Sequence, residues 1–190
     1  VVSPSLSIFD AITKVPGFTA TSVFAAAPEC ENANGTIVRD RTVTTFTNCR
    51  IGGVILNGAI GRVIGSTGAL GFSDYKITHI KTKRSFTYNG TLAISDVQGV
   101  GTRITGTLAV VSSEHGPSTL EFVRILLAGD GSVRQGTLVY DLTKTDSKRI
   151  ARIKIDFSDA DELPVTVELR NGRVLRLTLD RDTRTVRLPL

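Results

Sequence analysis

Apolar and polar residues alternate along most of the chain, and this period of two is what most restricts its fold. The stretch Arg149–Phe157 shows it clearly, although its charge would also suit a helix. Successive side chains of a strand point to opposite faces, so alternation predicts strands with one buried face. Turn pairs such as Asp130-Gly131 and Asn171-Gly172 separate the alternating runs. The sequence therefore predicts an all-β protein.

Eleven strands follow from this pattern. They are expected at Ile37–Phe46, Val54–Ile64, Tyr75–Lys83, Phe86–Ser95, Arg103–Ser112, Thr119–Leu127, Val133–Leu142, Arg149–Phe157, Val165–Leu169, Val174–Leu179 and Val186–Leu190. Short turns join most of them, and strands joined by short turns pair antiparallel. We expect an antiparallel meander that forms a β-sandwich or a barrel.

The N-terminal segment differs from the rest of the chain. Apolar side chains stand at alternate positions with serines between them, at Val2, Pro4, Leu6 and Ile8. We expect residues 1–28 to form an extended arm and residues 29–190 a single β domain, with a subdivision near 113–118 left open. The arm is either an ordinary first strand of its own sheet or a strand that completes the sheet of a neighbour.

The cysteine content indicates the compartment. The chain has two cysteines, Cys30 and Cys49, and an even pair of this kind is expected to form a disulfide in a secreted protein, with two buried thiols as the alternative. Position 1 is Val1 and Met is absent, from which we expect a removed leader. No apolar run is long enough for a transmembrane helix. The expected location is extracellular or at the cell surface.

The formal net charge of +5 invites a nucleic-acid interpretation. The charges are mixed in sign, however, and the C-terminal arginines are interrupted by Asp180 and Asp182. Such a distribution is typical of a solvated strand face and not of a phosphate track. We expect no nucleic-acid partner.

No enzyme motif is found. His79 lies in a strand and His115 in a loop, and neither is accompanied by a nucleophile motif. The glycines between Gly99 and Gly106 lead into a strand, unlike those of a dinucleotide-binding loop. We expect neither catalysis nor a cofactor.

Two groups of polar residues are candidates for other sites. The only acidic cluster comprises Asp156, Asp159, Asp161 and Glu162. It matches no calcium loop, so a solvated turn is the preferred interpretation over a metal site. Asn34 and Asn89 begin Asn-Gly-Thr sequons for glycosylation, but both also belong to a repeated turn phrase.

Two phrases recur along the chain. The first is a polar residue followed by glycine, a small residue and an aliphatic one, as at Asn57-Gly58, Asn89-Gly90, Thr105-Gly106 and Gln135-Gly136. The second begins with phenylalanine, at Phe46-Thr47-Asn48-Cys49, Phe72-Ser73-Asp74-Tyr75 and Phe157-Ser158-Asp159-Ala160. Glycine within these strands is expected at a bulge, a bend or a close backbone approach.

The stretch Phe46-Thr47-Asn48-Cys49, with Gly53, Leu56-Asn57-Gly58 and the Asn-Gly-Thr strands that follow, resembles a group of bacterial secreted or surface β-meander proteins. The resemblance covers roughly residues 30–112. It implies an exported protein and brings no catalytic residue.

Two functions are therefore carried forward. The first is an extracellular structural protein, a fibre or filament subunit whose N-terminal arm adds a strand to a neighbouring copy. The alternative is a monomeric secreted module that binds a glycan, a lipid or a surface protein at the loops Glu114–Pro117 and Ser158–Pro164.

Overall fold

The computed structural model describes residues 29–62, 68–114, 116–128, 132–142, 149–158, 161–180 and 186–187. The arm residues Val2, Pro4, Leu6 and Ile8 lie outside this part of the chain, as do His115 and Asp159. The strands are β1 (Thr36–Arg39), β2 (Val43–Ile51), β3 (Val54–Arg62), β4 (Ala69–His79), β5 (Ser85–Val97), β6 (Gly101–Ser112), β7 (Gly116–Leu127), β8 (Val133–Asp141), β9 (Ile150–Phe157), β10 (Glu162–Leu169), β11 (Val174–Asp180) and β12 (Val186–Arg187).

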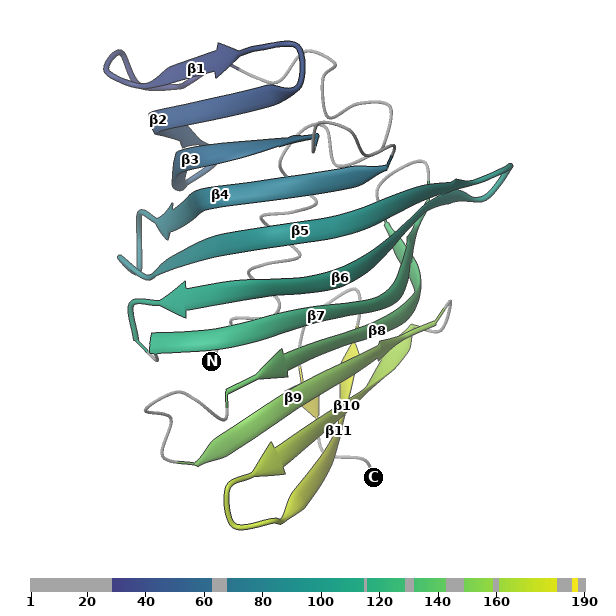
Figure 1. Ribbon diagram of the computed structural model, residues 1–190. Helices are drawn as coiled ribbons and strands as arrows, with labels where there is room; N and C mark the ends of the chain where they lie inside the picture. Colours follow the sequence, from purple (N-terminus) through teal and green to yellow (C-terminus); the bar gives the residue numbers. More distant parts are fainter. Residues whose placement is uncertain are drawn as a thin grey trace.

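All twelve strands form one antiparallel sheet in chain order, from β1 to β12. Figure 1 labels the strands from β1 to β11 in this order. The predicted all-β antiparallel meander is confirmed. The sheet is open: β1 pairs only with β2 and β12 only with β11, so the described strands do not close into a barrel or form a second sheet of a sandwich. The end strands have four and two residues, which offers few hydrogen bonds for closure.

Several strand limits differ from the prediction, and two of them differ most. Ile37–Phe46 is not one strand, because the chain turns between β1 and β2. Asp40 makes this turn: its carboxylate accepts a hydrogen bond from the Arg41 N–H, and its own N–H donates to the Val43 carbonyl. Asp is a preferred turn residue for this reason. In addition, β4 begins at Ala69, six positions before the expected Tyr75.

One face of the sheet, called here the inner face, carries the hydrophobic core. On β6, Ile104 and Leu108 are buried on this face, whereas Thr105 and Thr107 on the opposite, outer face are not. The same alternation runs from Phe46 on β2 to Leu179 on β11. The period of two in the sequence therefore reports the burial of a single face.

A line of irregular residues crosses the sheet from β2 to β8. The backbone φ angle is positive at Asn48, Gly58, Asp74, Gly90, Gly106, Arg124 and Gly136. The register shifts by a β-bulge at three of these places, within Phe46–Cys49, Phe72–Tyr75 and Val123–Leu126. Bulges bend a strand and increase its twist. We call these seven residues the bend line.

The two recurring phrases of the sequence meet on this line. Each Phe lies directly opposite a Gly of a neighbouring strand, in the pairs Phe46–Gly58, Phe72–Gly90 and Phe157–Gly136. Phe122 and Gly106 form a fourth such pair. Because glycine has no side chain, each phenylalanine meets no side chain directly opposite on the strand that carries the glycine. A close backbone approach, one of the three settings expected for these glycines, is found at Gly58 and Gly136, where an added β-carbon would lie within 3 Å of the neighbouring backbone.

Two asparagines of the first phrase, Asn57 and Asn89, accept hydrogen bonds from the bulged residues of the neighbouring strand. The N–H of Asn48 donates to the Asn57 side-chain oxygen at 2.8 Å, and the N–H of Asp74 donates to that of Asn89 at 2.7 Å. The Asn89 amide also donates to the Asp74 carboxylate at 3.0 Å. A bulge interrupts the ladder, and these side chains satisfy the N–H groups that it displaces.

Candidate functional site

The edge of β2 is the most elaborately built part of the described chain. The strand β1 covers only half of it, pairing with Thr44–Thr47. Beyond β1, the stretch Asn48–Gly52 directs backbone groups to the same side. These groups are covered by the residues Cys30–Asn32, which we call the clamp.

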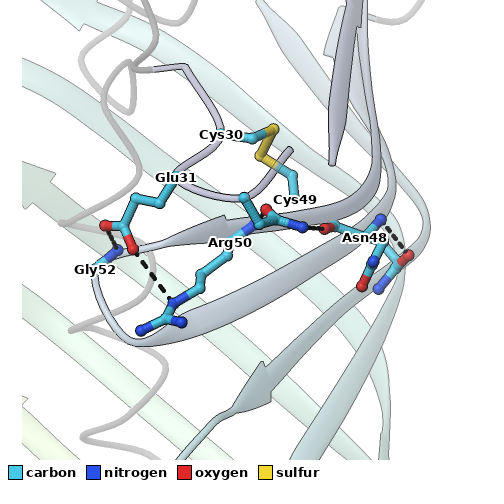
Figure 2. The surroundings of a disulfide bond; sticks show 8 residues. Cys30, Glu31, Asn48, Cys49, Arg50 and Gly52 are labelled. Carbon is cyan, nitrogen blue, oxygen red and sulfur yellow. Dashed lines mark hydrogen bonds and ion pairs between the residues drawn. A yellow bond between two sulfur atoms is a disulfide. The ribbon is translucent and has the colours of Figure 1, made fainter. Parts of the chain in front are cut away.

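The clamp binds this edge through four backbone groups, three on β2 and one on Gly52 directly after it. Figure 2 shows Cys30 and Glu31 of the clamp beside Cys49, Arg50 and Gly52. The Glu31 N–H donates to the Arg50 carbonyl, and the Glu31 carboxylate accepts from the Gly52 N–H, both at 2.8 Å. The Asn32 side chain accepts from the Arg50 N–H at 2.7 Å and donates to the Asn48 carbonyl at 2.8 Å. Three of these four hydrogen bonds use side chains of the clamp and only one uses its backbone. The clamp therefore covers the edge of β2 without itself forming a strand to which another strand could pair.

The disulfide between Cys30 and Cys49, with a sequence separation of 19, ties the clamp to the strand. The expected pairing is present. A loop of this length contributes about 3 kcal/mol in the chain-entropy model. The Glu31–Arg50 ion pair at 3.4 Å is half exposed and adds at most about 1 kcal/mol. The covalent bond is therefore the main tether. Such bonds are typical of proteins outside the reducing cytosol.

The other half of the edge is presented by β1 itself. The hydrogen bond from Asp40 to Val43 places Val38 in a bonded pair with Thr45, so the backbone groups of Ile37 and Arg39 point away from β2. Ile37 packs against the core but is only partly buried, and Val38 is 62% exposed. No strand in the described part of the chain lies beyond β1. The apolar inner face thus continues to the last strand at this end.

The two sequons occupy different environments. Asn34 is exposed in the turn between the clamp and β1. Asn89 is held within the sheet, where both atoms of its side-chain amide bond to Asp74. A glycan on Asn89 would remove these contacts, so only Asn34 has the setting of an acceptor.

A second candidate site is an open hollow of about 330 Å³ on the outer face of β6–β10. It is lined by Thr107, Thr119, Glu121, Val139, Asp141, Arg152, Lys154 and Glu168. Arg152 joins two acids there, Asp141 at 3.2 Å and Glu168 at 3.4 Å. The hollow is formed by residues of five neighbouring strands that pair in register.

The three tyrosines of the chain lie on the inner face, and burial raises the pKa of each. Tyr75 and Tyr88 are a cross-strand pair, and the charge of a neighbouring tyrosinate adds to the shift at Tyr88. Tyr140 bonds to the Ser118 hydroxyl at 3.0 Å, which offsets part of its shift. The Tyr75 hydroxyl makes no hydrogen bond to any described residue. All three rings serve as core residues in their neutral form.

The other predicted candidates are dispersed. Within the acidic cluster, Asp156 accepts from the Thr137 hydroxyl and pairs with Lys154, while Asp161 and Glu162 are exposed. No three potential metal ligands gather within the described residues. His79 ends β4, half buried on the inner face. In the loop before β7, Glu114 pairs with Arg84 at 2.6 Å.

Comparison with protein-family models, with curated proteins and with solved structures finds no match in any of the three. No helix that could span a membrane occurs within the described residues. The sequence predicts the disulfide of the two cysteines, but no motif marks Glu31 and Asn32 of the clamp or Arg50, which they contact on β2.

Proposed function

We propose that the protein is an extracellular structural subunit, in which the N-terminal arm of one copy adds as a strand to β1 of a neighbour. The observation that carries the proposal is the open end of the sheet at β1, where the apolar inner face reaches Ile37 with no described strand beyond it. Strand addition satisfies backbone groups at such an edge and fills adjoining pockets with alternate side chains.

The arm has the pattern that such an edge requires. Its apolar residues, Val2, Pro4, Leu6 and Ile8, stand at alternate positions and would extend the inner face past Ile37. Its serines would continue the polar outer face. The clamp restricts addition to β1, because it already occupies the backbone groups of Asn48–Gly52. A head-to-tail contact that does not close on itself generates filaments, and this is the assembly that we propose.

We expect the substitution Ile37→Lys to abolish assembly. A lysine at this partly buried edge position can reach solvent in the free subunit, but an added strand would bury it. Assembly would then require an unpaired charge to leave water, which costs several kcal/mol. Sedimentation velocity should show only the 20.3 kDa chain for the variant and larger particles for the unchanged protein.

The matched control is Leu175→Lys, at a partly buried inner-face position on β11, near the other end of the sheet. It should assemble as the unchanged protein does. Deleting residues 1–12 should have the same effect as Ile37→Lys. If the deleted protein assembled normally, strand addition by the arm would be refuted.

The second candidate function is a monomeric binding module, and the hollow on the outer face favours it. Its wall combines the cations Arg152 and Lys154 with the acids Glu121, Asp141 and Glu168. A polar ligand that carries both charges would fit this lining. This candidate gains support if the protein is a monomer and Arg152→Ala abolishes binding to a glycan array.

A further inference from the structure

The clamp and the edge of β2 are chemically matched to each other. Glu31 provides a carboxylate to the Gly52 N–H and to the Arg50 guanidinium, while Asn32 uses both ends of its amide on β2. The sulfur of Cys30 meets that of Cys49. Each of these contacts joins the clamp to β2 alone, so the same set can form when the clamp comes from a second copy of the chain.

The link between the clamp and β1 is a short turn. The Gly35 N–H donates to the Asn32 carbonyl at 3.1 Å. The turn packs so closely that a β-carbon at Gly35 would lie 2.6 Å from the Asn32 side-chain oxygen and 2.8 Å from the Asn48 carbonyl. Opening this turn would release the clamp while β1 stays paired with β2, since the four-residue ladder of β1 lies beyond the turn.

We propose that the β2 edge at Asn48–Gly52 is a docking site for the clamp of a second copy, reached when the disulfide within the chain is opened. A dithiol opens it by giving two electrons and two protons, which yields the thiols of Cys30 and Cys49 and leaves the dithiol as a cyclic disulfide. A small disulfide such as oxidised glutathione then accepts two electrons and two protons, and the Cys30–Cys49 bond forms between copies.

Exchange of an identical element between copies is a low-cost route to association, because the contacts of the closed form are remade. The half-exposed ion pair and the exposed hydrogen bonds hold the clamp weakly once the covalent tether is gone. The docking site for the clamp lies at the same end of the sheet as β1, to which the arm is proposed to add. It uses the residues Asn48–Gly52 instead of β1 and does not depend on the arm.

The test uses the full chain in ordinary and nitrogen-15 forms, mixed in equal amounts. The mixture is reduced with dithiothreitol, and retention of the sheet is checked by circular dichroism. It is then reoxidised with oxidised glutathione at high protein concentration. Mass spectrometry of the proteolytic digest should show Cys30–Cys49 peptides of hybrid mass, which only a bond between copies can produce.

The control is Asn32→Ala, which keeps both cysteines but loses the hydrogen bonds to Asn48 and Arg50. We expect the yield of hybrid Cys30–Cys49 peptides, measured relative to mispaired Cys30–Cys30 peptides, to fall about 5-fold from that of the unchanged protein. The inference is overturned if hybrid peptides are absent, or if this ratio is the same in the variant, which would show random oxidation. Assembly of the oxidised protein is a separate measurement, so failure of the proposed function would leave this result unaffected.

Discussion

The substitution Gly58→Ala is expected to destabilise the sheet by about 3–5 kcal/mol. Gly58 lies on the bend line with a φ angle of 87°, in the left-handed region that favours glycine. A β-carbon there would overlap the carbonyl group of Asp74 on the neighbouring strand. Both the strain and the overlap fall on backbone atoms, which cannot rotate away. The midpoint of urea unfolding measures the loss.

Gly172→Ala is the matched control for this prediction. Its φ angle of 81° is nearly the same, but nothing lies within 4 Å of the added β-carbon in the turn between β10 and β11. Only the backbone strain remains, so we expect a loss of about 1 kcal/mol. Equal losses for the two variants would show that the close approach of β3 and β4 at the bend line is absent.

Raising the pH above about 10 is expected to lower the free energy of unfolding steeply. Burial is the main cause that raises the pKa of Tyr75, Tyr88 and Tyr140 above the ordinary value of a tyrosine, about 10. The unfolded chain therefore loses these protons near pH 10, while the folded chain keeps them. Since the unfolded state then binds fewer protons, stability falls as pH rises, by up to about 1.4 kcal/mol per pH unit for each tyrosine.

Tyr75→Phe isolates this effect from other groups that titrate in the same range. It removes one titrating hydroxyl that makes no hydrogen bond to the described residues, and the ring contacts with Phe46 and Phe72 can be kept. Between pH 10 and 11 the variant should lose about 1 kcal/mol less stability than the unchanged protein, because the unfolded tyrosine is only half ionised at pH 10. Identical slopes for the two proteins would mean that Tyr75 is not buried as described.

The strands and their order were predictable because both depend on local information. Alternation defines the buried face, and short turns such as Asn171-Gly172 force neighbouring strands to pair. Sequence alone could not determine whether the meander closes, since closure depends on how many hydrogen bonds the end strands offer. The predicted strand Ile37–Phe46 is divided between β1 and β2 by the turn at Asp40, whose side chain bonds to the backbone of the next residue.

The candidate site was predictable only in part, because it depends on which residues of neighbouring strands lie opposite each other. The phrases beginning at Phe46 and Phe72 were visible as repeats, but only cross-strand pairing shows that each faces a glycine. The cysteine pair predicted one contact of the clamp, the disulfide between Cys30 and Cys49. The contacts of Glu31 and Asn32 with Arg50 join residues about as far apart in the chain as the cysteines are, and no spacing rule connects them.

The mass of the native oxidised particle is the most direct test of the proposed strand addition. Light scattering over a range of concentrations, with negative-stain images of the same sample, measures it. The account predicts filaments or particles many times heavier than the 20.3 kDa chain, which grow with concentration. A single species of 20.3 kDa at every concentration would contradict it and favour the binding module at the hollow of β6–β10.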